Sequence, residues 1–352
     1  RPSEVKEASP RREARMRLSP PAPPLVFAGR PRYICRCCVS FRRSSRNRPA
    51  PATMSQVYQT VDELDFDLSD CPALPRPDQV ILTTPHYFDV QYVINPHMSG
   101  HVGSVDRNVA VQQWKALRAT YTALGIEPKI VEGQPGLPDM VFCANQTLPF
   151  YDPKINRRGV VLSNMQAEQR KEEVPHFAEY FQGNGYAVER LPDDFDDPFE
   201  GMGDAIWHPG RSLLWGGFGF RSALEPYRSL ASMLETRVLA LELTDADFYH
   251  LDTCFSPLDE HSVLLYPGAF TDDGLDLVEH FFSTIVEAPE EEARHQFACN
   301  AHCPDGHHVL IQEGCTTTQK RLRNAGFKPI DLDTSEFMKS GGSVFCMKQM
   351  IW

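Results

Sequence analysis

Short apolar runs alternate with amphipathic stretches along most of this chain. Runs of four to eight apolar residues between turn residues are typical of strands, and they occur at residues 80–83, 128–131, 159–162, 187–191, 237–243, 262–266 and 308–311. Apolar residues at helical spacing predict helices at residues 108–124, 169–182, 226–234, 274–282 and 316–325. Because strands alternate with single helices, the pattern predicts an α/β fold.

The first 53 residues show neither the strand period nor the helix period, and their charge differs from that of the rest of the chain. They contain 13 Lys or Arg and 3 Asp or Glu, with many Pro and Ser. This composition predicts a disordered basic extension. Two origins stay open: a transit peptide that begins at Met16, or upstream translation before a start at Met54. We therefore expect residues 54–352 to form a single catalytic domain, which is cytoplasmic, or mitochondrial if residues 16–53 act as a transit peptide.

The remainder of the chain is acidic. Of the 35 Lys or Arg and 47 Asp or Glu in the whole chain, 22 and 44 remain after residue 53, which gives a net charge of −22. Such a surface disfavours nucleic acid as a partner and favours a small cationic molecule. No apolar run is long enough to predict a membrane span. The ten cysteines are scattered without a disulfide framework, which indicates a reducing compartment.

Polar residues interrupt four apolar runs, each of which is interpreted as the end of a buried strand. These signatures are PDMVFCANQ at 138–146, FEGMGDAIW at 199–207, FYHLDTCF at 248–255 and GGSVFC at 341–346. Burying ionisable groups is costly unless they are paired or used in chemistry. Together, Cys346, His250 and Glu200 could form a nucleophile, its base and an orienting carboxylate. The sequence thus predicts a cysteine-nucleophile enzyme.

Each signature also has a plain structural explanation. Cys346 alone would be a small buried hydrophobe, and His250 alone a hydrogen-bonded core histidine. Asp139 and Asn145 could cap the two ends of one strand. Asp252 stands two residues after His250, so on a strand both side chains would point into one pocket. The agreement of several signatures favours the functional interpretation.

Taken together, the four ordered signatures resemble the guanidino-group-modifying superfamily, also called the pentein or amidinotransferase superfamily. The resemblance extends from about residue 80 to the last residue. It is strongest toward arginine dihydrolase-like and dimethylarginine dimethylaminohydrolase-like members, through the early loop HYFDVQYVINPHM, PDMVFCANQ and the final GG-x-x-x-Cys. It implies a five-bladed, pseudo-symmetric ββαβ propeller with the active site in its central channel, and neither a metal nor an organic cofactor.

The resemblance also implies roles for individual residues. Cys346 would attack the guanidinium carbon, and His250 would protonate the departing amine and then activate water. Glu200 and Asp252 would hold guanidinium N–H groups by charge-assisted hydrogen bonds. The substrate would be a small cationic guanidino compound. The implied substrate-binding residues are Asp252, Asn145, Asp139, Asn95, Arg221 and Asp204.

Two positions depart from the family pattern. Many relatives have Asp where Asn145 stands, and Asn offers an NH₂ donor that suits the oxygen of a citrulline-like ureido group. Relatives tend to have an Arg that binds the substrate carboxylate where this chain has Asn164. Arg221 matches the other carboxylate-binding Arg of the family and could act alone. At the amino-acid end of the substrate, the prediction therefore rests on Arg221.

Three functions are compared. The first is a hydrolase of arginine, methylated arginine or citrulline that works through a covalent thiouronium-type intermediate. The second is an amidinotransferase that passes the amidino group to an amine, and the third is a catalytically silent binding protein of the same fold. A cysteine peptidase is disfavoured because the extra carboxylate of Asp252 suits a cation. The Cys and His residues at 299–308 match no standard zinc-site spacing, so no metal is expected.

Overall fold

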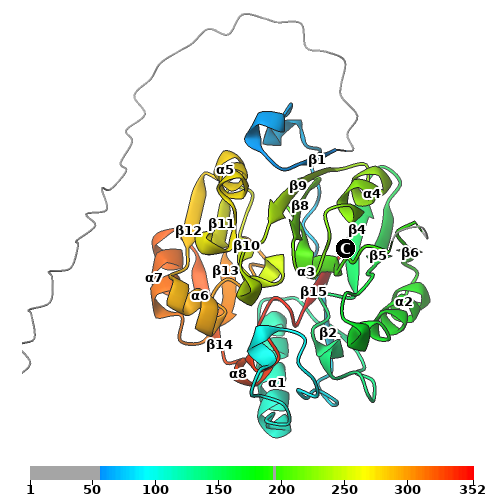
Figure 1. Cartoon of the computed structure of the whole chain (residues 1–352), viewed down its shortest axis with the longest axis vertical. Coiled ribbons are helices and arrows are strands. Elements are labelled where there is room, and N and C mark those ends of the chain that lie inside the picture. Colours follow the sequence, from blue (N-terminus) through cyan, green and yellow to red (C-terminus); the bar gives the residue numbers. More distant parts are fainter. Residues whose placement is uncertain (1–55, 193–195) are drawn as a thin grey trace, which may run out of the picture. The chain divides into compact units, whose positions relative to one another are not determined.

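The computed structural model describes residues 56–192 and 196–352, which lie in one compact unit. The basic extension predicted at residues 1–53 lies outside the described residues. Five separate sheets surround a common centre, and most of the helices lie on their outer side (Figure 1). No helix of the described residues is both long and apolar enough to cross a membrane.

The sheets share one arrangement: two antiparallel strands, a helix, and a third strand parallel to the second. In one sheet a single bridge replaces the first strand, and in another the first strand comes from the end of the chain. The clearest example has β4 (Thr147–Asp152) antiparallel to β5 (Arg157–Leu162), followed by α2 (Glu173–Gly183) and β6 (Ala187–Glu189), which is parallel to β5. Helix α2 presents Val174, Phe177 and Phe181 on one face, at spacings of three and four residues, to the apolar side of this sheet.

Three further sheets follow in chain order. The next consists of β7 (Ala205–Trp207), β8 (Leu213–Phe218), α4 (Pro226–Met233) and β9 (Arg237–Glu242), with β1 (Val57–Tyr58) added beside β9. It is followed by β10 (Phe255–Pro257), β11 (Ser262–Leu265), α5 (Asp272–Phe281) and β12 (Thr284–Glu287). After α6 (Glu290–Gln296) come a bridge between His302 and Leu310, β13 (His308–Gln312), α7 (Thr316–Asn324) and β14 (Lys328–Leu332).

The fifth sheet joins the two ends of the described chain. Strand β15 (Gln349–Ile351) is antiparallel to β2 (Gln79–Thr83), and β3 (Lys129–Val131) is parallel to β2 after α1 (Arg107–Ala123). Two short helices, α3 (Gly201–Asp204) and α8 (Ser335–Met338), stand outside this repeat. Because the last strand completes a sheet begun by an early one, the ring closes and the segment before β15 is held at its centre.

The elements predicted from periodicity are confirmed. All seven strands and five helices occur, with ends displaced by a few residues, and α2 begins at Glu173 after a separate 3₁₀ turn at Glu168–Arg170. Strands β1, β4, β7, β8, β10, β12, β14 and β15 were not predicted. Several of these have only three or four residues, which is too short to establish a period of two.

The interpretation of the polar signatures as strand ends is wrong. Residues Pro138–Val141 form a 3₁₀ helix, and β4 begins only at Thr147. His250 is the N-cap of another 3₁₀ helix, Leu251–Thr253, so His250 and Asp252 do not share a strand face. The signatures lie in the irregular segments that precede strands, where side chains can be directed to one point.

Candidate active site

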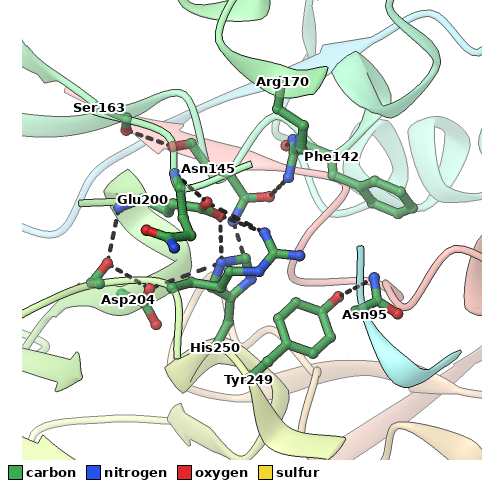
Figure 2. A network of polar contacts seen from close by, with 12 residues as sticks. Asn95, Phe142, Asn145, Ser163, Arg170, Glu200, Asp204, Tyr249 and His250 are labelled. Carbon is green, nitrogen blue, oxygen red and sulfur yellow. Dashed lines mark hydrogen bonds and ion pairs between the residues drawn. The ribbon is translucent and has the colours of Figure 1, made fainter. Parts of the chain in front are cut away.

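Four predicted site residues and Asn300, which was not predicted, come from equivalent places in the five sheets. Asn145 lies just before β4, Glu200 before α3 and β7, and Asp252 before β10. Asn300 lies before the bridge at His302, and Cys346 before β15. Since the first strands start near the ring centre, these segments converge there. Figure 2 shows the resulting polar network around His250.

Cys346 is 2% exposed, and its sulfur has two polar neighbours. Sγ lies 3.1 Å from Oδ2 of Asp252 and 3.1 Å from Nδ2 of Asn300. Burial and the charge of Asp252 raise the pKa of the Cys346 thiol well above its usual value. Burial likewise raises the pKa of Asp252 to about 7. Without a bound cation, the pair therefore favours a neutral thiol.

Asn300 fixes the loop that carries the thiol. Its Oδ1 accepts hydrogen bonds from the backbone N–H groups of Ser343, Phe345 and Cys346 at 3.0, 3.0 and 3.3 Å. Its Nδ2 also donates to the backbone oxygen of Asp252 at 2.9 Å. One fully buried amide therefore ties the segment of Cys346 to the segment of Asp252.

His250 is oriented by a buried carboxylate. Its Nε2 lies 2.7 Å from Oε2 of Glu200, so Nε2 carries the proton that this hydrogen bond needs. The other nitrogen, Nδ1, lies 3.5 Å from Nδ2 of Asn145 and faces the cavity. This assignment leaves Nδ1 free to accept or return a proton.

Glu200 is ionised despite complete burial. Burial alone would raise its pKa, but the charge of Arg221 and the hydrogen bond from His250 outweigh burial and lower the pKa to about 2. Arg221 Nη1 donates to Glu200 Oε2 at 3.0 Å, and the backbone N–H of Gln166 donates to Oε1 at 3.0 Å. The charged Glu200 therefore fixes the orientation and the tautomer of His250.

Asp204 lies behind this pair. Its Oδ2 accepts from the hydroxyl of Ser222 at 2.6 Å, and its Oδ1 accepts from the backbone of Leu251 at 2.9 Å. Oδ2 is also 3.9 Å from Nε2 of His250. Burial raises the pKa of Asp204 to about 6. Both oxygens thus hold protein groups, and Asp204 does not line the cavity that contains Cys346.

Arg170 sets the orientation of Asn145. Its Nη1 donates to Asn145 Oδ1 at 3.0 Å, so the NH₂ group of Asn145 is the end directed toward His250 (Figure 2). Arg170 is itself held by Glu173 at 2.9 Å and by the backbone oxygen of Asp139 at 3.2 Å. All three guanidinium nitrogens of Arg170 have partners, which fixes its position.

The opposite wall of the cavity carries Asp139, Asn95 and Tyr249. Asp139 Oδ1 accepts from the hydroxyl of Ser340 at 2.8 Å, and burial raises the pKa of Asp139. Asn95 Nδ2 donates to the backbone oxygen of Ser340 at 3.0 Å, while Tyr249 donates to that of Gly341 at 2.6 Å. These bonds hold the glycine turn that precedes Cys346.

The two positions considered for binding the substrate carboxylate, Asn164 and Arg221, differ in location. Asn164 makes structural hydrogen bonds to the backbone oxygens of Asp196 and Asp197, at 3.2 and 3.0 Å, and does not line the cavity. Arg221 does line it, with its guanidinium 4.9 Å from the Tyr249 ring centre and its Nη2 donating to the backbone of Ile94. Of the two, only Arg221 can meet a ligand in this cavity.

Six of the nine predicted residues line the cavity, namely Cys346, His250, Asn145, Asp139, Asn95 and Arg221. Glu200 and Asp252 do not line it but lie 2.7 Å from His250 and 3.1 Å from Cys346, respectively, and Asp204 is held 3.9 Å from His250. The sequence patterns did not predict Asn300, Arg170 and Tyr249. Tyr249 stands beside His250 and could have been noticed, but Asn300 and Arg170 belong to no polar signature. Their burial is the only signal that distinguishes them.

The Cys and His residues at 299–308 do not form a metal site. His302 is bonded to the hydroxyl of Tyr121 at 2.8 Å, and His308 is paired with Asp305. Within residues 56–192 and 196–352, no three His, Cys, Asp or Glu side chains are grouped to hold a metal ion.

Comparison with known proteins gives consistent matches. Residues 95–352 match the family "N,N dimethylarginine dimethylhydrolase, eukaryotic". The chain is 38% identical over 273 residues to the bifunctional arginine dihydrolase/ornithine cyclodeaminase AgrE of Nostoc sp., covering 76% of this chain and 37% of that protein. It is 34% identical to the N(G),N(G)-dimethylarginine dimethylaminohydrolase of Mycobacterium tuberculosis, covering 77% of this chain and 85% of that protein. The chain thus spans just over a third of the AgrE sequence.

Solved structures confirm the fold. The substrate-bound N-terminal domain of ArgZ, a cyanobacterial arginine dihydrolase, superimposes with a TM-score of 0.72 at 36% identity, covering 77% of this chain and 97% of that domain. A dimethylarginine dimethylaminohydrolase bound to S-methyl-L-thiocitrulline superimposes with a TM-score of 0.62 at 21% identity and supports the fold alone. The predicted pentein fold and the resemblance to the guanidino-group-modifying superfamily are both confirmed.

Proposed function

Because the chain belongs to the N,N-dimethylarginine dimethylhydrolase family, we propose that it hydrolyses a guanidino amino acid through a covalent bond to Cys346. The favoured substrate is arginine, which would be converted through citrulline to ornithine. Residues 54–352 would act as one catalytic domain. The seven cysteines of the described residues are all unpaired and buried, which supports work in a reducing compartment such as the cytoplasm.

The observation that carries this proposal is a pair of buried acceptors without donors. Asp252 Oδ1 and Asp139 Oδ2 have no hydrogen-bond partner among the described residues. A buried unpaired carboxylate oxygen is costly, and a guanidinium ion supplies the charged N–H donors that would satisfy it. The other oxygen of Asp252 lies 3.1 Å from the sulfur of Cys346. A guanidinium held by Asp252 would therefore have its carbon beside the nucleophile.

The first half of the reaction begins when the bound cation lowers the pKa of the Cys346 thiol. The thiolate forms a C–S bond to the guanidinium carbon. His250, oriented by Glu200, takes the thiol proton on Nδ1 and gives it to the departing nitrogen, and the C–N bond breaks to release ammonia. A thiouronium remains on Cys346. Asn300 holds the thiolate through its Nδ2 donor and fixes the loop against the segment of Asp252.

Water completes the cycle. His250, now neutral at Nδ1, takes a proton from the water molecule that attacks the thiouronium carbon. The C–S bond then breaks, releasing a ureido product and the thiolate. A second round on the ureido carbon would release another ammonia and leave a carbamate, which loses carbon dioxide. In balance, one arginine and two waters give one ornithine, one carbon dioxide and two ammonia molecules.

The orientation of Asn145 supports this second round. Arg170 occupies its oxygen, so only the NH₂ group is offered to a ligand. An NH₂ donor satisfies a ureido oxygen, whereas a carboxylate in the same place would repel that oxygen. At the amino-acid end, Arg221 and Asn95 line the cavity and would bind the substrate carboxylate and its neighbouring amine.

The test is product analysis by mass spectrometry. The full chain is incubated separately with arginine, citrulline and asymmetric dimethylarginine, beside the Cys346→Ala variant. Ornithine and ammonia formed only by the unaltered protein would support the dihydrolase. Citrulline as the end product would restrict the function to the first hydrolysis. Adding glycine to the arginine reaction tests amidino transfer, because guanidinoacetate would then appear. No turnover of any substrate by folded protein would contradict the proposed function.

A further inference from the structure

A second cavity lies beyond the residues that surround Cys346. Its lining includes Met202, Pro257, His302 and Lys348. These stand a few residues after Glu200, Asp252, Asn300 and Cys346 respectively, in segments that lead away from the active site into the first strands of their sheets. The two cavities share no lining residue. This rear cavity therefore lies on the other side of the layer of site residues.

The rear cavity has largely apolar walls. Five prolines, among them Pro75 and Pro304, stand with the indole rings of Trp207 and Trp352. Prolines and indoles are rigid and favour flat apolar groups. The charged residues of the lining are both cationic, Lys348 and Arg76.

Lys348 is the unusual member of this lining. It is 1% exposed, and its ammonium group forms no hydrogen bond or ion pair with any residue of the described ranges. Its Nζ lies over the Phe345 ring, 3.1 Å from the ring centre. A buried ammonium without an acceptor is costly, and burial lowers its pKa to about 7.

We propose that the rear cavity binds a small organic monocarboxylate with a flat apolar body. The carboxylate would pair with Lys348, and with Arg76 nearer the opening. Arg76 is only partly buried, and its Nη1 makes a long hydrogen bond of 3.4 Å to the backbone of Cys303, so it can turn to a ligand. A monoanion fits better than a phosphate dianion, because its desolvation in apolar walls costs less.

A carboxylate bound in the rear cavity would affect the active site electrostatically. Lys348 stands close enough to Asp252 and Cys346 for each to influence it, together with Cys143 and His302. The ammonium counteracts the raised pKa of Asp252. A carboxylate beside Lys348 would cancel this effect and favour the protonated, inactive forms of Asp252 and Cys346. The ligand would therefore inhibit without competing with the substrate.

The binding test does not depend on the proposed function. Benzoate is titrated into the full chain while tryptophan fluorescence is followed, with benzamide as the uncharged isostere. We expect saturable quenching by benzoate, and binding of benzamide weaker by about tenfold or more. Lys348→Met should weaken benzoate binding by about tenfold or more and Arg76→Gln by about threefold, because charge-assisted bonds are lost. Arg221→Gln, in the substrate cavity, should leave it unchanged.

Three outcomes would overturn the proposal. One is the absence of saturation up to about 20 mM benzoate, far above a useful affinity. Another is equal binding by Lys348→Met and the unaltered protein. The last is loss of binding only in Arg221→Gln, which would place the anion in the substrate cavity. Circular dichroism checks that Lys348→Met is folded; if it is not, Arg76→Gln decides alone. Inhibition by benzoate is measured separately and tests only the coupling.

Discussion

The side-chain amide of Asn300 contacts both the side chain and the backbone of Cys346. Its Nδ2 lies 3.1 Å from the sulfur, and its Oδ1 accepts a hydrogen bond from the backbone N–H of Cys346 at 3.3 Å. The residue that would stabilise the thiolate is thus the residue that shapes its loop. A single substitution can separate these two effects, because Asp keeps the acceptor and removes the donor.

Asn300→Asp should slow alkylation of Cys346. The new carboxylate places a second negative charge beside the sulfur and raises the thiol pKa further. We expect the rate of Cys346 alkylation by iodoacetamide at pH 8 to fall about tenfold or more, because a rise of about one unit in the thiol pKa lowers the thiolate fraction about tenfold. The rate is read at Cys346 by mass spectrometry over a range of pH. Asn324→Asp, on the exposed side of α7, is the control, and an unchanged pH profile for Asn300→Asp would contradict the assigned contact.

Asp252→Asn should stabilise the protein at alkaline pH. Burial raises the pKa of Asp252 to about 7, so the folded state binds a proton that the unfolded state loses near pH 4. This carboxyl therefore makes the free energy of unfolding fall as pH rises from about 4 to 7. Asn has no such dependence. We expect the variant to gain about 1–4 kcal/mol relative to the unaltered protein between pH 4 and 8 in urea unfolding.

The control for this measurement is Asp276→Asn, on the exposed face of α5. This substitution should leave unchanged the difference in the free energy of unfolding between pH 4 and pH 8. If Asp252→Asn behaved like this control, Asp252 would not be the protonated partner of the thiol.

Asn145→Asp should change the product. A carboxylate would pair with Arg170 and repel a ureido oxygen, while a guanidinium would still bind. Citrulline should therefore accumulate where the unaltered protein gives ornithine. The ratio of the two products is measured, because it does not depend on the fraction of active protein. Asn164→Asp, outside the cavity, should leave the ratio unchanged, and an unchanged ratio in Asn145→Asp would remove the role of Asn145 in the second step.

Gly203→Ala should damage the site through sterics alone. A Cβ at Gly203 would lie 2.2 Å from Nδ2 of Asn145, so the amide that faces His250 would be displaced. Turnover should fall by about a hundredfold, as expected for a misplacement of about 1 Å. Gly183→Ala, in α2, meets nothing within 4 Å and should retain full turnover. Equal activity in both variants would show that the Asn145 position is not critical.

The sequence by itself determined seven of the strands, five of the helices and the chemical class. Its periodicity predicts these elements because burial of one face leaves a regular pattern in the chain. Its four signatures identify Cys346, His250 and Glu200 because ionisable groups within apolar runs need a physical reason. These are local features, so neighbouring residues suffice to detect them.

Only the tertiary structure decided what surrounds these groups. Asn300 lies far in sequence from Cys346, and Arg170 lies far from Asn145. Neither belongs to a polar signature, and both contacts exist only because the ring brings these segments together. The pairing of β15 with β2 joins distant parts of the chain, and a three-residue strand carries no pattern that reveals its partner. No pattern in the sequence predicts the burial of Lys348 either. Long-range contacts set these features, since burial and hydrogen-bond direction depend on the whole fold.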